Sequence, residues 1–216
     1  MSASWSTKLD KLMENLPNAV AAYLQFEYLC KRDSLFSEAY MAKPIGEYLI
    51  SNKTLGSLVT EYNHPAFEKS ETGRSQQLDF AFLRSGEEEN PSFALETKWY
   101  WANRSSTLAN GRILNDILRL RLLVGKCDNA KFYFLIGALK EDFEKFKKNE
   151  FYKNVLENEK KLIHIEDIID TAYKRVKEQT KENINKSQIT SFKIRKKIES
   201  TDNNICTVCL WEIAAR

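Results

Sequence analysis

The sequence predicts an α/β protein in which a central mixed sheet is flanked by helices. Segments with apolar residues at helical spacing alternate along the chain with shorter segments that are either alternately apolar and polar or almost wholly apolar. In the middle of the chain the predicted order is helix, three strands, helix, strand, which is typical of layered α/β architectures. A chain of 216 residues is long enough for one domain of about 150 residues with additions. We therefore treat residues 1–216 as a single domain.

The first third of the chain is predicted to be helical. Residues 1–33 form a helical N-terminal layer with two short helices, 5–16 and 18–32, because Pro17 lacks the N–H that a continuous helix needs. A third helix is predicted over 34–52, where Pro44 should produce a kink.

Strands follow, together with one strongly apolar helix. Apolar alternation or continuous apolarity predicts strands over 56–63, 76–83, 92–100 and 131–139. The segment 112–125, ending near Gly125, is apolar on a wide face and is predicted to be a buried helix.

The C-terminal extension, residues 140–216, is predicted to end in a hairpin. The expected elements are a helix over 141–157, a short strand over 161–165, a helix over 166–184, and hairpin strands over 187–200 and 204–214.

Composition restricts the partners and the compartment. The hydrophobic content of 43% and charged content of 29% are ordinary for a globular protein, and no apolar run approaches the roughly 20 residues of a membrane span. The N-terminus lacks the basic and apolar parts of a secretory signal, so we expect a cytoplasmic protein without membrane contact. Segment 174–197 holds nine basic and two acidic residues, a balance of +7, which suits a polyanion partner or simply a solvated face.

Cysteines do not indicate a metal or disulfide framework. Cys30 and Cys127 are isolated, and strand alternation would point Cys206 and Cys209 to opposite faces. We expect reduced, mostly buried thiols rather than a zinc site.

The stretch FALETKWYW, residues 93–101, places an acid and a base within an otherwise apolar and aromatic run. On a strand, Glu96 and Lys98 share one face with Ala94. In the preceding predicted strand, Asp79 is the one charged residue. If the two strands are neighbours, Asp79 and Glu96 converge, and two carboxylates are hard ligands suited to Mg²⁺ or Mn²⁺. A structural ion pair between Glu96 and Lys98 is the alternative.

A sequence motif of the chain resembles that of the PD-(D/E)xK superfamily of restriction-endonuclease-like nucleases. The motif consists of Asp79, sixteen further residues and then Glu96-Thr97-Lys98, and the predicted elements around it follow the order helix, strand, strand, strand, helix, strand. The resemblance covers about residues 34–139, the expected nuclease-like core, and departs from the written motif because Leu78 replaces the proline before Asp79. It implies a restriction-endonuclease-like core and a metal held by Asp79 and Glu96, with the Thr97 carbonyl as a further ligand. Lys98 would position or activate the attacking water and stabilise the scissile phosphate.

Members of this superfamily often add a glutamate from the helix before the sheet. Glu38, Glu47 and Glu61 compete for this role, and we favour Glu38 because it shares a helical stripe with Leu35 and Ile45.

Nucleic-acid contacts are predicted at several basic residues. Arg74 precedes the Asp79 strand, and Arg119 or Arg121 lies on the helix that packs near the site in this superfamily, although an Asp116–Arg119 helix pair would explain these charges equally well. In the hairpin, Lys193, Arg195 and Lys197 would share one strand face and follow a nucleic-acid backbone, unless they only protect a sheet edge.

The expected function is therefore Mg²⁺- or Mn²⁺-dependent hydrolysis of phosphodiester bonds. By the resemblance, the enzyme would be a DNA endonuclease of restriction or defence type that acts on double-stranded DNA, and a homodimer would allow both strands to be cut. The alternatives are a catalytically inactive module that binds nucleic acid or protein on the same fold, and an enzyme that acts on RNA.

Overall fold

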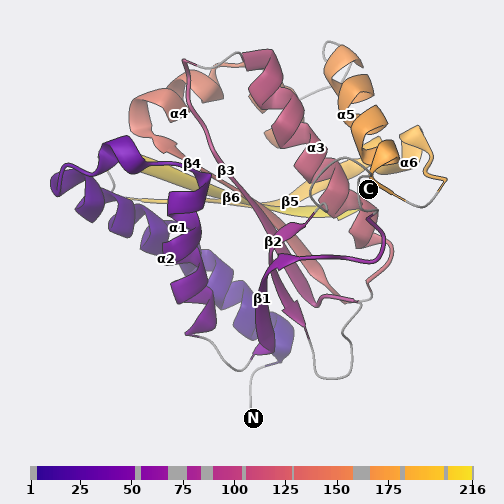
Figure 1. Cartoon of the computed structure of the whole chain (residues 1–216), viewed down its shortest axis with the longest axis horizontal. Coiled ribbons are helices and arrows are strands. Elements are labelled where there is room, and N and C mark those ends of the chain that lie inside the picture. Colours follow the sequence, from indigo (N-terminus) through magenta and orange to yellow (C-terminus); the bar gives the residue numbers. More distant parts are fainter. Residues whose placement is uncertain are drawn as a thin grey trace.

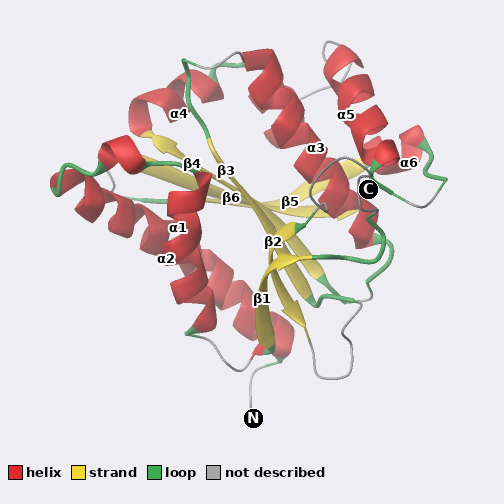
Figure 2. Ribbon diagram, in the orientation of Figure 1, coloured by secondary structure: helices red, strands yellow, loops and turns green. Residues whose placement is uncertain are grey.

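The computed structural model describes residues 4–51, 55–67, 77–83, 90–103, 106–127, 129–157, 166–180, 183–201 and 204–215. These residues form a six-stranded mixed sheet with helices on both faces, which confirms the predicted α/β class (Figures 1 and 2). The strands are β1 (Ser57–Tyr62), β2 (Leu78–Leu83), β3 (Phe93–Trp99), β4 (Lys131–Leu139), β5 (Phe192–Glu199) and β6 (Cys206–Ala215). The helices are α1 (Trp5–Leu29), α2 (Glu38–Ile50), α3 (Ser106–Val124), α4 (Lys140–Lys147), α5 (Glu166–Glu178) and α6 (Lys186–Thr190).

The sheet order is β1-β2-β3-β4-β6-β5. Strands β1, β2 and β3 form an antiparallel meander, and α3 connects β3 to the parallel strand β4. The C-terminal strands join the same sheet, because β6 pairs antiparallel with β4 and carries β5 on its other edge.

Each face of the sheet has its own hydrophobic core. Helices α1 and α2 cover one face, where Tyr133 and Leu135 of β4 are buried. Helices α3 and α4 cover the opposite face, where the alternate residues of the same strand, Phe134 and Ile136, are buried. Because both faces are covered, β4 is apolar almost throughout, as its sequence indicated.

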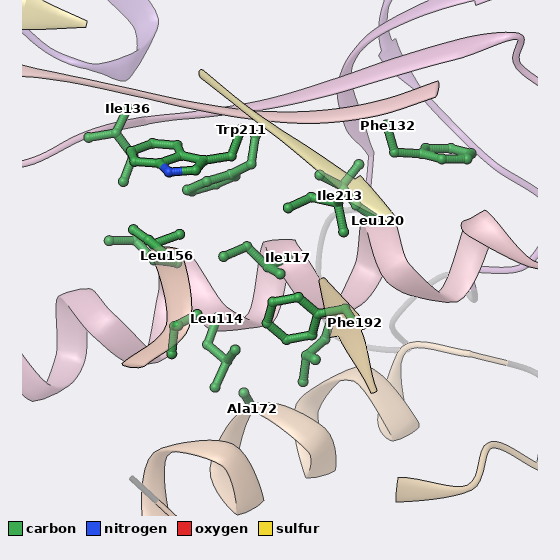
Figure 3. Packing of buried hydrophobic residues seen from close by; sticks show 14 of the residues in the cluster. Leu114, Ile117, Leu120, Phe132, Ile136, Leu156, Ala172, Phe192, Trp211 and Ile213 are labelled. Atoms are coloured by element: carbon green, nitrogen blue, oxygen red, sulfur yellow. The ribbon is translucent and has the colours of Figure 1, made fainter. Parts of the chain in front are cut away.

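Helix α3 lies between the sheet and α5. In Figure 3, Leu114 and Ile117 of α3 lie between Trp211 of β6 and Ala172 of α5, and all four residues are fully or almost fully buried. This double burial explains why the helix is apolar over a wide face.

The prediction of two helices separated by Pro17 is wrong, because α1 is continuous from Trp5 to Leu29 and contains Pro17. Its buried residues continue at helical spacing on both sides of the proline, from Leu9 and Met13 to Val20 and Leu24. Packing of this stripe against the sheet and α2 offsets the cost of about 3 kcal/mol for a proline within a helix.

Other helix boundaries also differ from the prediction. The expected helix over 34–52 is divided into a 3₁₀ turn, Asp33–Leu35, and α2, because the Ser37 hydroxyl accepts a hydrogen bond from the Tyr40 N–H and begins a new helix. The expected helix over 141–157 ends at Lys147 and is followed by a π-helical turn over Tyr152–Leu156.

Two further predicted elements lie in the C-terminal half of the chain. Helix α5 ends at Glu178 instead of extending to 184. The predicted strand over 161–165 lies outside the described residues.

The two cysteines of the CxxC sequence lie on opposite faces of β6, as alternation predicted. Cys206 belongs to the core under α1 and α2, and Cys209 belongs to the core under α3. Within the described part of the chain, no helix combines the length and the apolar composition needed to cross a bilayer.

The predicted basic face of β5 is not formed. A register shift between Ile194 and Lys196 interrupts the alternation of side chains. Residues after the shift therefore point to the opposite face of the sheet from the one that alternation predicts. Lys197 lies over the ring of Tyr152 on the α3 side, whereas Lys196 pairs with Glu14 of α1 on the other side. Arg195 and Lys197 are themselves paired, with Glu212 and Glu157 respectively.

Candidate functional site

Strands β2 and β3 bring Asp79 and Glu96 together. Phe80 pairs with Leu95 and Ala81 with Ala94, so continuing this antiparallel register by one position sets Asp79 opposite Glu96. Both carboxylates lie on the α3 side of the sheet, where Ala81 and Ala94 belong to the core. The convergence expected from two neighbouring strands is therefore present.

Thr97 holds the Asp79 carboxylate in place. Its backbone N–H and its hydroxyl donate to Oδ2 of Asp79 at 2.7 and 2.8 Å. In a strand, the N–H and C=O of one residue point to the same neighbouring strand, so the Thr97 carbonyl is also directed to the Asp79 side. That direction agrees with the expected third oxygen.

Lys98 is fixed by two carboxylates from different helices. Its Nζ lies 3.0 Å from Oε1 of Glu38, the first residue of α2, and 3.0 Å from Oδ2 of Asp116 on α3. Glu47 and Glu61, the other two glutamates considered from the sequence, are both exposed. The Lys98 ammonium therefore connects the helical layers on both sides of the sheet.

Arg119 of α3 is the second cation of the site. Its Nη1 lies 3.2 Å from Oε1 of Glu96 and 3.5 Å from Oδ1 of Asp116, and its Nη2 donates to the Gln77 carbonyl at 2.6 Å. The side chain is only 5% exposed. The sequence-level Asp116–Arg119 pair is present, but the guanidinium is buried beside Glu96 and does not lie on an open surface.

These six residues, which we call the charged cluster, are Glu38, Asp79, Glu96, Lys98, Asp116 and Arg119. Four are acids and two are bases, so the cluster carries a formal charge of −2 when all are ionised. A divalent cation would neutralise this charge.

Burial raises the pKa of three acids in the cluster, Glu96, Asp79 and Glu38. Desolvation raises the pKa of Glu96 well above its usual value although Arg119 opposes the shift, and it raises the pKa of Asp79 and of Glu38 although Lys98 opposes both shifts. Burial alone would lower the pKa of Lys98, but Asp116, Glu38 and the other acids outweigh it and raise that pKa. Lys98 therefore remains an ammonium at neutral pH.

Two buried carboxylate oxygens of the cluster lack a hydrogen bond, although each lies close to a cation. Oε1 of Glu96 is buried and close to Arg119, but the geometry of that contact is not that of a hydrogen bond, and the same holds for Oδ2 of Asp116 beside Lys98. Among the described residues, no group of three or more His, Cys, Asp or Glu side chains is arranged to hold a metal ion. Mg²⁺ commonly uses one or two carboxylates and takes its other ligands from water and substrate phosphate.

A pocket of about 480 Å³ adjoins the cluster. Lys98 and Glu38 line it together with aromatic residues at and just after the end of β3 and residues from the first half of α3: Trp99, Tyr100, Trp101, Leu108, Ala109, Arg112 and Ile113. Tyr100 both lines the pocket and packs, because its ring lies near that of Phe146 at 4.3 Å between centroids.

The other predicted nucleic-acid contacts are dispersed. Arg74 lies outside the described residues. Lys193, Arg195 and Lys197 are on the edge strand β5, whereas the charged cluster is on α2, β2, β3 and α3. Arg121 donates to the Ser191 carbonyl. The structure thus unites Asp79, Glu96, Thr97, Lys98, Glu38 and Arg119, but not the basic residues of β5.

Sequence reasoning gave no site role to three residues that the structure places at the site. Asp116 was considered only as a helix partner of Arg119, although an acid on a strongly apolar helix is itself a signal of a buried polar contact. Trp101 lies beyond the end of β3 at Trp99, where strand alternation no longer predicts the direction of a side chain. Arg112 carried no signal at all.

Comparison of the chain with protein-family models, with curated proteins and with solved structures finds no significant match.

Proposed function

We propose that the protein is a metal-dependent nuclease that hydrolyses phosphodiester bonds, with Mg²⁺ or Mn²⁺ as cofactor. The observation that carries this proposal is the largely buried, formally −2 cluster in which Asp79 and Glu96 converge and Lys98 projects to the same side. Burying acids in this way costs stability, and clustered groups with perturbed pKa values are often found at functional sites.

The order of elements supports the same proposal. Helix α2, the meander β1-β2-β3, the crossover helix α3 and the parallel strand β4 follow one another as the PD-(D/E)xK resemblance implies. We propose that these elements are a restriction-endonuclease-like core and that DNA is the substrate class, which the resemblance favours over RNA.

The residues of the site would have different roles in the reaction. Asp79 and Glu96 would hold the cation, with the Thr97 carbonyl directed to the same side. The ion, when bound, supplies positive charge that polarises the phosphate and lowers the pKa of water. Lys98 remains protonated, so it would donate hydrogen bonds to the phosphate or the attacking water rather than accept a proton.

Glu38 is the carboxylate best placed to accept the proton. Its side chain is 44% exposed, and its pKa is raised by desolvation, which makes it a stronger base than an ordinary glutamate. Water would attack phosphorus, the bond to the leaving oxygen would break, and that oxygen would gain a proton. The products are one phosphomonoester and one hydroxyl end.

One observation favours a second function, a binding module without catalysis. Arg119 already places a cation 3.2 Å from Glu96, as in a purely structural ion network. In that case Glu96 and Lys98 would stabilise the fold, and the same surface would only bind nucleic acid or protein.

Cleavage assays separate the two functions. The full chain is incubated with plasmid and with DNA and RNA oligonucleotides, with Mg²⁺, with Mn²⁺ and with a chelator. We expect metal-dependent cleavage that falls about 100-fold or more in Lys98→Met, because a charge that stabilises the transition state is lost. The matched control is Lys131→Met, since Lys131 is also a strand lysine paired with an acid and is 16% exposed, against 20% for Lys98. Binding without cleavage of any substrate would establish the module instead.

A further inference from the structure

The pocket beside Lys98 has the size and lining of a site for one planar group. Its volume of about 480 Å³ lies in the range of roughly 300–1,000 Å³ that is typical of small-molecule sites. A concave site of this size admits a base and its sugar but not the side of a duplex.

The pocket offers an aromatic surface. Trp99 and Tyr100 are 8% and 6% exposed, so they form the buried wall. Trp101 follows the end of β3, is partly buried, and is held edge-on by Trp99 at 5.8 Å between ring centroids. A supported, partly open indole is a suitable stacking partner for a nucleobase, since every base has a π-face.

Two basic side chains in the lining of the pocket suit the phosphates of a strand. Lys98 is one of them and belongs to the charged cluster. Arg112 lines the pocket from α3 and is exposed, and it makes no ion pair with any other residue that the structure describes. An unpaired guanidinium is a strong donor to phosphate oxygens.

We infer that this pocket binds the base of an unpaired nucleotide, with its phosphates between Arg112 and Lys98. This inference rests on the proposed hydrolysis and narrows its substrate class. A base can enter the pocket only when it is not stacked and paired, so the substrate is a single strand, an overhang or a nucleotide extruded from a duplex. Uninterrupted duplex DNA is a poor substrate.

Binding measurements test the assignment independently of cleavage. A fluorescent single-stranded DNA is titrated with the full chain in Ca²⁺ in place of Mg²⁺. The competitors are blunt duplex DNA and an abasic strand of equal length, which keeps the phosphates and lacks the bases. We expect Trp101→Ala to weaken single-strand binding about 10- to 100-fold, and Trp101→Phe to retain most of it. The matched control is Phe26→Ala, an aromatic residue on α1 that is 59% exposed and lies outside the pocket lining.

Arg112→Met provides a second variant that cannot disturb the core, because Arg112 is exposed. It should weaken binding of the normal and the abasic strand alike and reduce the slope of affinity against salt by about one. Unchanged binding of both strands would overturn the assignment of Arg112.

The outcomes separate the two proposals. Equal binding of blunt duplex and single strand by the wild-type protein, or equal loss for normal and abasic strands in Trp101→Ala, would overturn the base pocket. If duplex DNA is cleaved equally fast by wild type and Trp101→Ala, the pocket assignment fails and the hydrolase remains. If base-dependent binding is present and no substrate is cleaved, the hydrolase fails and the pocket remains.

Discussion

Replacing Arg119 by Met tests whether the charged cluster depends on the balance between its acids and bases. The substitution keeps an unbranched apolar side chain but leaves Glu96, which is 1% exposed, without its cation, and it also removes the 2.6 Å hydrogen bond to the Gln77 carbonyl. Removing one partner of a buried ion pair costs about 3–5 kcal/mol. For a chain of this length each kcal/mol lowers the Tm by about 2–4 °C, so we expect a decrease of about 6–20 °C.

The pH dependence of this loss has a definite sign. The pKa of Glu96 is already raised, and without Arg119 it should rise further. A raised pKa of an acid contributes stability below its unfolded value of about 4.5, and that contribution is lost as the pH rises through the folded value. The Tm deficit of Arg119→Met should therefore grow from about pH 5 to pH 8. Excess Mg²⁺ should restore part of it if Asp79 and Glu96 hold the ion.

Thermal unfolding with and without Mg²⁺ measures these effects, and Arg121→Met is the matched control. Arg121 lies on the same helix and donates one hydrogen bond to the Ser191 carbonyl, whose loss should cost about 0.5–1.5 kcal/mol. A Tm for Arg119→Met no lower than that of Arg121→Met, or a deficit that does not change with pH, would refute the electrostatic account of the cluster.

Three further predictions concern the metal, the packing behind the site and the helical layer. Asp79→Asn keeps an oxygen that can accept hydrogen bonds from Thr97 but removes the charge of a proposed ligand, so the Tm increase caused by Mg²⁺ should disappear. Scanning fluorimetry measures this increase, and an undiminished increase in the variant would exclude Asp79 as a ligand. Gly137→Ala should lower the Tm by about 2–12 °C, because overpacking of a core costs about 1–3 kcal/mol. The new Cβ would lie 2.6 Å from Sδ of Met41 and 3.0 Å from two ring carbons of Trp99. A thermal melt in which the variant is as stable as the wild type would contradict this packing. Hydrogen bonds from Arg32 and Tyr40 lower the pKa of Glu27 to about 2, so the contribution of Glu27 to stability is lost as the pH falls from about 4.5 towards 2. In a pH titration followed by circular dichroism, the stability of Glu27→Gln should therefore fall less steeply with decreasing pH in this range than that of the wild type.

Much of the sheet was predictable because its local patterns agree with the tertiary structure. The apolar run of β4 spans the same residues, 131–139, in the prediction and in the structure, since burial on both faces leaves little ambiguity. Alternation correctly placed Cys206 and Cys209 on opposite faces and Glu96 with Lys98 on one face. Helix boundaries were less predictable, because the continuity of α1 through Pro17 depends on packing that no local propensity reports.

By itself, the sequence determined that an acid and a base share one face of a core strand near a second acid, because strand alternation is a local geometric rule. Only the tertiary structure decided which groups meet them. Asp116 and Arg119 come from a helix that crosses the sheet, and Glu38 comes from the opposite layer. The register shift in β5 also depends on pairing with β6, and it divides the basic residues that sequence alternation had placed together. Contacts of this kind join residues distant in sequence, and their energies depend on burial that exists only after the layers have packed.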